Sequence, residues 1–336
     1  MKRVGFLFEK AFTMDHLYLA YLDARKGKRG TSACFRFEKD LWHNLKSLHT
    51  RLHNGTYKPM PYKKFKVFEP KERTIYAPAF KDLVVQHAIY RLIYPVFDKT
   101  FIHTSYACRK GKGAHKASDY TQKAMRQCRP GEYSLKLDIR KYFYSISRVV
   151  LRRLIERKIK DRRFVNLMMV FAEMETRIGI PIGNLLSQIY ALIFLNPLDH
   201  FVKRVLKVKR YVRYVDDFIL IGLTRDQCLS LRKKIVAYLS DKLKLSLSKS
   251  TIATIRRGIN FVGYRTWQTK RFIRKYSLFK FRRKAKAGDQ AAVASMLGHA
   301  KRTSSVIRLF KIIKEVGHHD LEIPKNYRHS YHLCVG

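Results

Sequence analysis

The sequence predicts a globular α+β protein, and both composition and patterning indicate this class. Hydrophobic residues make up 46% and charged residues 29% of the 336 residues, a balance typical of chains that fold around a core. Apolar residues recur at helical spacing in some segments and alternate in others, where turn residues join strands into hairpins. A chain of this length can form a large core and two or three subdomains.

Charge, apolar runs and cysteines restrict the partners and the compartment. Lys and Arg total 71 against 25 Asp and Glu, a formal net charge of +46, which predicts nucleic acid as the first choice of partner and an anionic membrane surface as the second. The longest apolar run, Ile189 to Leu195, is too short to span a bilayer, and the N-terminal apolar stretch ends at Glu9, too early for a signal peptide. We therefore expect no membrane. The five cysteines lack metal-site spacing and suit reduced packing residues in a cytoplasmic protein.

The N-terminal part combines helices with one basic hairpin. Apolar periodicity predicts helices at 13–26, 41–55 and 82–94. Between Lys63 and Tyr76, two alternating segments flank a turn that contains Pro70, which predicts a hairpin. The cations near its tip either protect an edge strand or close on a triphosphate, and they are Lys64, Lys66 and Arg73.

Three carboxylates mark the ends of predicted strands. The alternating segment 133–138 predicts a strand that ends at Asp138. The segment 211–220 reads as two apolar strands joined by a turn that holds Asp216 and Asp217. Alone, the pair could be a solvated turn and Asp138 a helix cap. Like charges at the tip of a buried hairpin repel each other, however, and a divalent metal held by all three carboxylates would offset that repulsion.

Two loops stand before predicted helices. The basic glycine loop 105–115 is either a turn or a site for a backbone phosphate. The loop 179–188 contains two glycines, which either let a base or sugar approach the backbone or form an ordinary connection. The helix that follows it, 189–201, is expected to kink at Pro197.

The C-terminal part becomes increasingly basic. A helix at 226–243, strand-like residues at 245–255 and a hairpin at 258–265 come first. From Lys270 onward, cations are interleaved with aromatic residues, which suits a nucleic-acid groove. Two helices, 289–300 and 305–316, complete a small helical subdomain, and the second is expected to turn Ile307, Phe310 and Ile313 to one side.

The order of these motifs resembles a reverse transcriptase from about residue 60 to residue 336. The motifs are the strand ending at Asp138, the glycine loop, Tyr214-Val215-Asp216-Asp217 and the basic helical tail. The blocks 105–109 and 261–264 are similar to the bacterial group II intron branch, which normally has Gln-Gly in the loop and Ser-Pro at its end. Here Ile182-Gly183 and Ser187-Gln188 stand in those places. This pattern, with the short length, resembles the reverse transcriptases of diversity-generating retroelements.

The resemblance implies a right-hand polymerase fold and a reaction. It implies an N-terminal helical extension at 1–60, fingers at 61–132, a palm at 133–270 with a finger insertion near 150–180, and a helical thumb at 271–336. The implied enzyme is an RNA-directed DNA polymerase that makes error-prone, adenine-mutagenic cDNA from a template-repeat RNA. The implied partners are this RNA template, the primer and its cDNA, dNTPs, and an oligomeric accessory variability protein.

The resemblance also implies roles for individual residues. Polymerisation is an in-line attack of a primer 3′ oxygen on an α-phosphate, and two Mg²⁺ ions can stabilise the attacking and leaving oxygens. Asp138 and Asp216 would hold them, with help from Asp217 and the Ile139 carbonyl. In the resembling family, the residues at the places of Lys66 and Arg73 contact the triphosphate, and Phe143 would exclude a ribose 2′-OH. Ile182 and Gly183 are expected to contact the nucleotide. The residues expected to hold the primer are Phe261, Gly263 and Tyr264. Lys249 is either a general acid or a solvated strand lysine.

Ile182 carries a further hypothesis. A Gln at this place could hydrogen-bond the nucleotide or template, whereas Ile cannot. Losing a fixed polar contact loosens selection of the correct pair, so Ile182 is expected to contribute to error-prone copying. Two alternatives stay open: a group II intron or retron-like reverse transcriptase of ordinary fidelity, and a non-catalytic RNA-binding scaffold on a polymerase fold.

Overall fold

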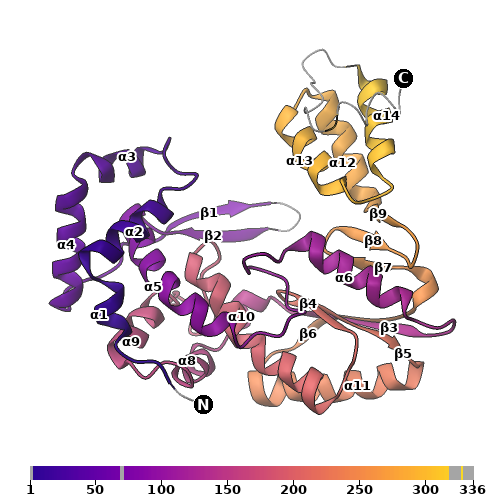
Figure 1. The fold of residues 1–336 in the computed structure, drawn as a ribbon, viewed down its shortest axis with the longest axis horizontal. Helices are drawn as coiled ribbons and strands as arrows, with labels where there is room; N and C mark the ends of the chain where they lie inside the picture. Colours follow the sequence, from indigo (N-terminus) through magenta and orange to yellow (C-terminus); the bar gives the residue numbers. More distant parts are fainter. Residues whose placement is uncertain (1–2, 69–71, 318–326, 328–336) are drawn as a thin grey trace. The chain divides into compact units, whose positions relative to one another are not determined.

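The computed structural model describes residues 3–68, 72–317 and 327, and the chain divides into two compact units (Figure 1). Unit 1 consists of Met1–Ile102, Ile139–Val205 and Ile235–Ser248. Unit 2 consists of His103–Asp138, Leu206–Lys234 and Lys249–Gly336. Each unit draws on three separate stretches of sequence, so the chain crosses between the units several times.

Two features that the sequence singled out lie outside the described residues: the Pro70 turn and Cys334. The four cysteines that the structure describes are free thiols, and three of them are buried. This agrees with the packing role expected for them. The cytoplasmic location expected from the same cysteines stays a prediction.

Helices make up most of unit 1. They are α1 (Leu7–Ala11), α2 (Met14–Ala24), α3 (Ser32–Lys39), α4 (Leu41–His53), α5 (Phe80–Asp98), α7 (Tyr142–Ser145), α8 (Arg148–Glu156), α9 (Arg162–Val170) and α10 (Leu185–His200), with the π-helical turns η1 (Phe201–Val205) and η2 (Leu239–Leu243). The helices predicted at 13–26, 41–55 and 82–94 are confirmed as α2, α4 and α5. The sequence patterns miss α1 and α3, because helices of five and eight residues show too little periodicity.

The helix α10 is the apolar core helix of unit 1. It begins at Leu185, where the Asn184 side chain caps it by accepting a hydrogen bond from Leu186 N at 2.9 Å, and it continues through Pro197. Most of its residues are buried on all sides, as expected for a helix that is apolar all round. Among the described residues, Leu185–Val205 is the one helix long and apolar enough to cross a membrane, yet 67% of its most apolar window is buried, as in the core helix of a globular protein.

A basic hairpin projects from the helices of unit 1 (Figure 1). Its strands, β1 (Lys63–Val67) and β2 (Arg73–Ala77), pair antiparallel with Phe65 opposite Ile75, which confirms the predicted hairpin. The side chains of β1 are exposed throughout. Lys64 pairs with Glu175 and Lys66 with Glu72, so two of the three cations near the tip already have acidic partners.

Unit 2 contains two antiparallel sheets. The first has the order β4–β5–β3–β6 and the second the order β7–β8–β9. The elements are α6 (Ala114–Arg126), β3 (Tyr133–Ile139), β4 (Tyr211–Tyr214), β5 (Asp217–Leu223), α11 (Arg225–Tyr238), β6 (Leu247–Thr254), the 3₁₀ turn η3 (Ile255–Arg257), β7 (Ile259–Phe261), β8 (Tyr264–Thr266) and β9 (Arg271–Ile273). The helix α6 packs against β4, β5 and β8, and its buried face joins both sheets in one apolar cluster.

The central hairpin differs from its predicted form by one residue. The sequence predicts a turn made of Asp216 and Asp217. In the structure Tyr214 pairs with Asp217, so Val215 and Asp216 form the two-residue turn and Asp217 is the first residue of β5. The strand pattern could not fix this register, because apolar residues flank the two carboxylates on both sides.

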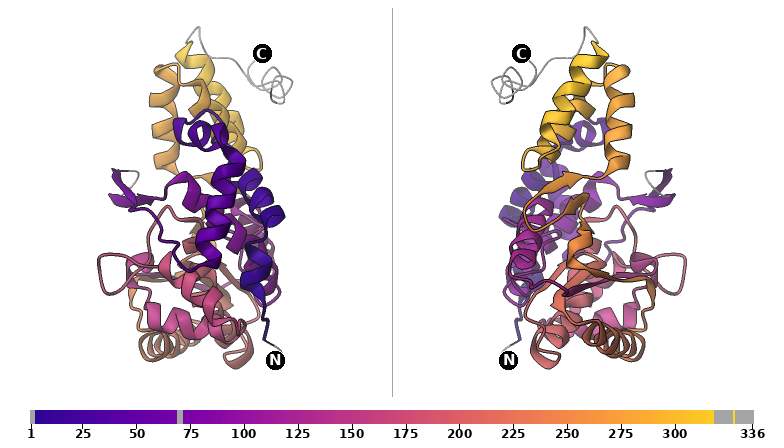
Figure 2. Two further views of the ribbon diagram at one scale, coloured as in Figure 1. Left: turned by 90° about the vertical axis from the view of Figure 1, so that its left-hand side faces the viewer. Right: turned by 90° about the vertical axis from the view of Figure 1, so that its right-hand side faces the viewer.

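Three helices form the C-terminal part of unit 2 and pack around a small core of their own (Figures 1 and 2). They are α12 (Lys275–Lys286), α13 (Gln290–Ala300) and α14 (Val306–Val316). The sequence predicts α13 and α14 correctly and reads α12 only as a basic, aromatic segment. The predicted apolar face of α14 is wrong at Ile307, which is 47% exposed, because Leu309 and Ile312 pack inward beside Phe310 and Ile313.

Tyr264 joins the second sheet of unit 2 to the three helices. Its ring stacks on His299 of α13 with centroids 4.3 Å apart, and its hydroxyl donates to the His299 carbonyl at 2.8 Å. The same hydroxyl lies 3.0 Å from His299 Nδ1 and 3.1 Å from His115 Nδ1 of α6. Burial lowers the pKa of His299, and the neighbouring His115 lowers it further.

This contact predicts a pH-dependent loss of stability. Because the folded-state pKa of His299 lies below its ordinary value of 6.5, the unfolded chain takes up this proton first as the pH falls. The stabilisation is therefore present above pH 6.5 and is lost as the pH falls from there toward the folded-state pKa. His299→Phe keeps a ring for Tyr264 and removes the proton, so it should flatten the pH dependence of the unfolding free energy by up to about 1.4 kcal/mol per pH unit.

Thermal or urea unfolding between pH 7.5 and 5 measures this effect. The matched control is His43→Phe, which changes an exposed histidine of α4 and should leave the slope unchanged. Equal slopes for the wild-type protein and His299→Phe would show that this contact is not sensitive to protonation.

Candidate active site

A strained two-residue turn presents the central carboxylates. Val215 has φ 55°, in the left-handed region that β-branched residues rarely adopt. Such a backbone persists only where the surrounding structure holds it, and it is common at functional sites. Asp216 follows Val215 in the turn and Asp217 opens β5.

A buried arginine holds this turn. Arg213 in β4 is 0% exposed, and its Nη1 donates to the Val215 carbonyl at 2.9 Å. Its backbone pairs with the loop before α6: Arg213 N donates to Thr104 O, and Tyr106 N donates to Arg213 O, each at 3.0 Å. The sequence analysis missed Arg213, although a charged residue between Val212 and Tyr214 in an apolar strand was a usable signal.

The three predicted carboxylates lie at the same end of the two central strands, β3 and β5, in the first sheet of unit 2. Asp138 at the end of β3 stands directly opposite Asp217 at the start of β5, and Asp216 precedes Asp217 in the chain. Side chains directly opposite each other in an antiparallel pair have Cβ atoms roughly 4.5–5.5 Å apart. Asp138 and Asp217 thus lie side by side as the sequence led us to expect, and the turn places Asp216 at the same end of the strands.

The charge of Asp217 is only partly compensated. Its Oδ2 lies 2.8 Å from the ammonium of Lys136 in β3, whereas its Oδ1 is buried without a hydrogen-bond partner. Burial raises the pKa of Asp217, the attraction of Lys136 opposes this, and repulsion from Asp138 adds to it. A buried carboxylate oxygen without a partner favours a proton or a cation beside it.

These residues suit a divalent cation by donor type. Mg²⁺ takes oxygen ligands, usually from one or two carboxylates, and the partnerless Oδ1 of Asp217 is such a donor. In the part of the chain that the structure describes, no group of three His, Cys, Asp or Glu side chains is already arranged around a common point. Ile139, whose carbonyl is the expected further ligand, is the buried last residue of β3.

Unit 1 carries the residues expected to face the nucleotide. The Ile182 carbonyl accepts a hydrogen bond from Tyr76 N at 2.7 Å, and Ile180 N donates to the Phe143 carbonyl at 2.9 Å. Gly183 has φ 104°, and a Cβ there would lie 2.7 Å from Ile75 Cγ2, so only glycine fits. Backbone contacts therefore bring the Ile182 loop, β2 and the Phe143 segment together.

The two hairpin cations take different places. Lys66 lies opposite Thr74 and forms an ion pair of 2.7 Å with Glu72, so a triphosphate would have to replace that carboxylate. Arg73, opposite Val67, is exposed. Their expected contact with a triphosphate stays a prediction.

The predicted primer-contacting residues are mostly buried. Phe261 is 1% exposed and Tyr264 is 0% exposed, so their side chains hold the hairpin to the protein core. Between them Gly263 has φ 91°, and a Cβ there would lie 2.9 Å from His299 Nε2. The tip itself consists of Val262, which is partly exposed, and Gly263, and its expected contact with a primer stays a prediction.

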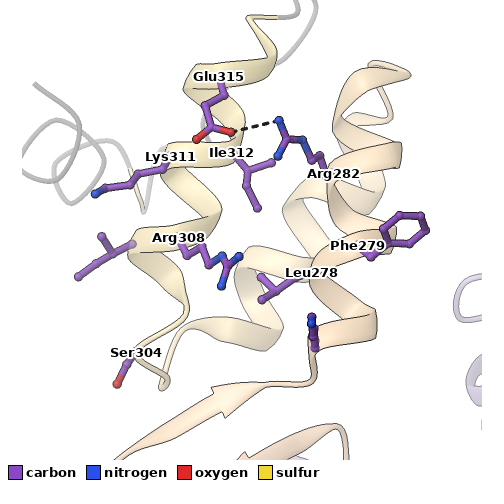
Figure 3. A pocket seen from close by; sticks show the side chains of 10 residues that line it. Leu278, Phe279, Arg282, Ser304, Arg308, Lys311, Ile312 and Glu315 are labelled. Carbon is purple, nitrogen blue, oxygen red and sulfur yellow. Dashed lines mark ion pairs between the residues drawn. The ribbon is translucent and has the colours of Figure 1, made fainter.

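A basic furrow runs through unit 2 as three adjoining pockets. One of about 680 Å³ lies on α12 and α14 (Figure 3), one of about 500 Å³ on the second sheet, and one of about 350 Å³ beside β3 and β6. The first two share Lys275, Leu278, Ser304 and Arg308, and the last two share Asn260 and Arg265. Figure 3 shows Arg308 and Leu278 directed toward each other, and Arg282 paired with Glu315 at 3.4 Å.

Cations and aromatic rings line this furrow. The cations are Lys136, Lys249, Arg257, Arg265, Arg274, Lys275, Arg282, Arg308 and Lys311, and the rings are Trp267, Phe272 and Phe279. Glu315 is the one acidic residue among the described lining residues. The candidate general acid Lys249 is exposed on β6 within this furrow. This combination suits a polyanion with stacking bases.

Comparison with known proteins identifies relatives of the chain. The model of the family described as "Reverse transcriptase (RNA-dependent DNA polymerase)" matches residues 62–266. Protein YkfC of Escherichia coli (strain K12) is 26% identical over 270 residues, which cover 66% of this chain and 70% of that protein. The group II intron-encoded protein LtrA of Lactococcus lactis subsp. cremoris is 24% identical over 296 residues, which cover 66% of this chain. The chain spans about half, 49%, of the length of LtrA.

Two solved structures show a weaker likeness. Telomerase from Candida albicans, in complex with a TWJ fragment of telomeric RNA, aligns with a TM-score of 0.47 and 13% identity over 82% of this chain and 64% of that one. Apo telomerase from Candida tropicalis aligns with a TM-score of 0.46 and 14% identity over 69% of this chain and 60% of that one.

The family match settles the class of the protein. It covers more than half of the chain and includes the carboxylates, the Ile182 loop and the hairpin that ends at Thr266. The expected α+β, right-hand polymerase fold and the expected enzyme class are thereby confirmed. The chain belongs to the reverse transcriptase family of RNA-dependent DNA polymerases.

Proposed function

We propose that this protein is the reverse transcriptase of a diversity-generating retroelement, and that it copies a template-repeat RNA into cDNA with errors opposite template adenines. The observation that carries the catalytic part is the Asp138–Asp217 pair beside Asp216. The observation that favours error-prone copying is Ile182 in place of a residue that could hydrogen-bond the nucleotide or template.

The carboxylates would perform metal-dependent phosphoryl transfer. Asp138 and Asp216 would hold two Mg²⁺ ions, with Asp217 and the Ile139 carbonyl as further ligands. Bound Mg²⁺ would stabilise charge on the attacking primer oxygen and on the leaving pyrophosphate. Arg213 keeps the turn in the conformation that presents Asp216, because its hydrogen bond fixes the Val215 carbonyl.

The other residues would bind and orient substrates. Arg73 and Lys66 would attract the triphosphate, and Phe143, held through its carbonyl by Ile180 N, would exclude a ribose 2′-OH. The basic furrow would bind the primer and template strands through their phosphates. Lys249, exposed in the same furrow, would serve as a proton donor to pyrophosphate.

The accessory variability protein belongs to this proposal as a partner. Its contact surface is not assigned to any residue. The domain boundaries at 60, 132 and 270 likewise stay predictions of the resemblance.

One alternative function has its own support. The similarity to LtrA, a group II intron-encoded protein, favours an intron-type reverse transcriptase of ordinary fidelity. The error spectrum of the cDNA separates this alternative from the proposal. The second alternative, a non-catalytic RNA-binding scaffold, predicts RNA binding without nucleotide incorporation.

The first prediction from this proposal concerns the carboxylates. Asp216→Asn keeps the size of the side chain and removes its charge, so Mg²⁺-dependent dNTP incorporation on an RNA template should fall by about 10²- to 10³-fold or more. The control is Asp226→Asn, which neutralises an exposed Asp of α11. Full incorporation by Asp216→Asn would exclude the proposed chemistry, and RNA binding without incorporation by the wild-type protein would favour the scaffold.

The second prediction concerns Arg213. Arg213→Met removes a hydrogen bond from a charged, buried donor, so the unfolding free energy should fall by about 1.5–3 kcal/mol. The released turn should also lower kcat for incorporation with little change in the KM for dNTP. Arg256→Met, which removes an exposed cation of η3, is the matched control. An unchanged kcat in folded Arg213→Met would show that the turn does not need this contact.

The third prediction concerns fidelity. The loop is held through the Ile182 carbonyl, so a new side chain can be introduced without removing its fixed contact to Tyr76. Ile182→Gln should lower misincorporation several-fold on a defined RNA, chiefly opposite adenines, because it restores a hydrogen-bonding group. Ile182→Val stays apolar and should keep the wild-type error spectrum. The same error spectrum for both variants would remove Ile182 from the explanation.

A further inference from the structure

Lys136 connects two parts of unit 2 through one ammonium group. Its Nζ lies 2.8 Å from Asp217 Oδ2 and donates to the Asn260 carbonyl of β7 at 2.6 Å. The same nitrogen lies 5.8 Å from the centre of the Phe261 ring. The side chains of Lys136 and Asp217 are each 23% exposed, so water screens this contact only partly.

The strand geometry explains why Lys136 reaches this place. Lys136 precedes Asp138 by two residues in β3, so both side chains lie on the same face of the sheet. The β7–β8 hairpin crosses that face at Asn260 and Phe261, where the Lys136 ammonium contacts both residues. A single lysine thus touches the sheet that carries the carboxylates and the hairpin whose tip is expected to contact the primer.

We propose that Lys136 is a positioning residue that ties the Asp217 carboxylate to the β7–β8 hairpin, so that cation binding at the carboxylates and placement of the primer end are coupled. The ammonium supplies a positive charge beside Asp217, which offsets part of the repulsion between Asp217 and Asp138. A Mg²⁺ ion that uses Asp217 must compete with this charge. The inference rests on the proposed function, because it takes these carboxylates as the Mg²⁺ ligands.

An ordinary structural ion pair would have different consequences. If Lys136 only stabilised the fold, its removal would lower the unfolding free energy and leave both the affinity for Mg²⁺ and the KM for primer unchanged. If Lys136 couples the carboxylates to the β7–β8 hairpin, its charge should affect Mg²⁺ binding and its hydrogen bond should affect primer use. Loss of the charge should tighten Mg²⁺ binding, and loss of the donor to the Asn260 carbonyl should weaken primer use.

Two variants of Lys136 separate these effects. Lys136→Met keeps the apolar stem and removes both the charge and the donor. Its half-saturating Mg²⁺ concentration should fall by about tenfold, and its KM for primer–template should rise several-fold with little change in the KM for dNTP. Lys136→Gln keeps an N–H donor without the charge, so its Mg²⁺ midpoint should fall while its KM for primer–template stays near the wild-type value.

The Mg²⁺ midpoint is read without turnover, from the shift of the melting temperature during a Mg²⁺ titration of the full chain without primer or dNTP. Lys136→Arg keeps the charge and the donor, so its Mg²⁺ midpoint and its KM for primer–template should both stay close to the wild-type values. Lys123→Met removes an exposed cation from α6 and serves as the charge-matched control. If Lys136→Met does not fold, Lys136→Gln and Lys136→Arg still test the Mg²⁺ part.

The outcomes distinguish this inference from the proposed function. If the wild-type protein incorporates dNTP but the Lys136 variants match Lys123→Met in Mg²⁺ midpoint and in KM for primer–template, the coupling is wrong and the proposed function stands. If the wild-type protein neither responds to Mg²⁺ nor incorporates dNTP, both are wrong. A lower Mg²⁺ midpoint in Lys136→Met and Lys136→Gln, reversed in Lys136→Arg, supports the coupling.

Discussion

The arrangement of unit 2 depends on one unfavourable contact, the pairing of Asp138 with Asp217 across β3 and β5. Like charges that stand directly opposite each other destabilise an antiparallel pair. The strands nevertheless keep this register, with Phe218 to Ile221 buried on both faces of β5. The packing of these side chains therefore has to offset the repulsion between the two carboxylates.

Two cations support this contact in different ways. Lys136 meets the carboxylate itself, at 2.8 Å from Asp217, and is partly accessible to water. Arg213 is fully buried and contacts the backbone of the turn instead, through the Val215 carbonyl. A planar guanidinium that stays charged suits a fixed backbone contact, whereas a compact ammonium is more easily replaced by another cation. One cation thus fixes the backbone of the turn, and the other pairs with a carboxylate while remaining partly accessible to water.

The sequence predicted the parts of this site that depend on local pattern. The hairpin around residues 211–223 and the strand ending at Asp138 follow from alternation and turn residues that are close together in the chain. It did not predict the contact of Lys136 with the β7–β8 hairpin, because Asn260 lies 124 residues away and no periodicity links the two. The helix α12 was not predicted for another reason. Only Phe281 and Ala285 form its buried apolar face, and the many cations and aromatic residues around them hide this short pattern in the sequence.

Errors of register and phase have a common physical origin. The residues of the central turn and the buried face of α14 were both predicted from neighbouring residues. In the structure, each depends on residues that are distant in the sequence. Asp217 pairs with Asp138 of β3 as well as with Tyr214, and this pairing places it in β5 rather than in the turn. The helices α12 and α13 decide which face of α14 is buried. A sequence pattern therefore predicts whether a segment is a helix or a strand more reliably than it predicts the register of the strand or the buried face of the helix.

The Ile182 loop is held in place without its central side chain. Its position is fixed by the Ile182 carbonyl, by Ile180 N and by a glycine at residue 183, and none of these depends on the side chain of residue 182. A half-exposed side chain on such a backbone can be replaced at little cost in stability. The side chain of residue 182 can therefore vary without loss of these contacts, because the Ile182 carbonyl and the Ile180 N–H are backbone groups.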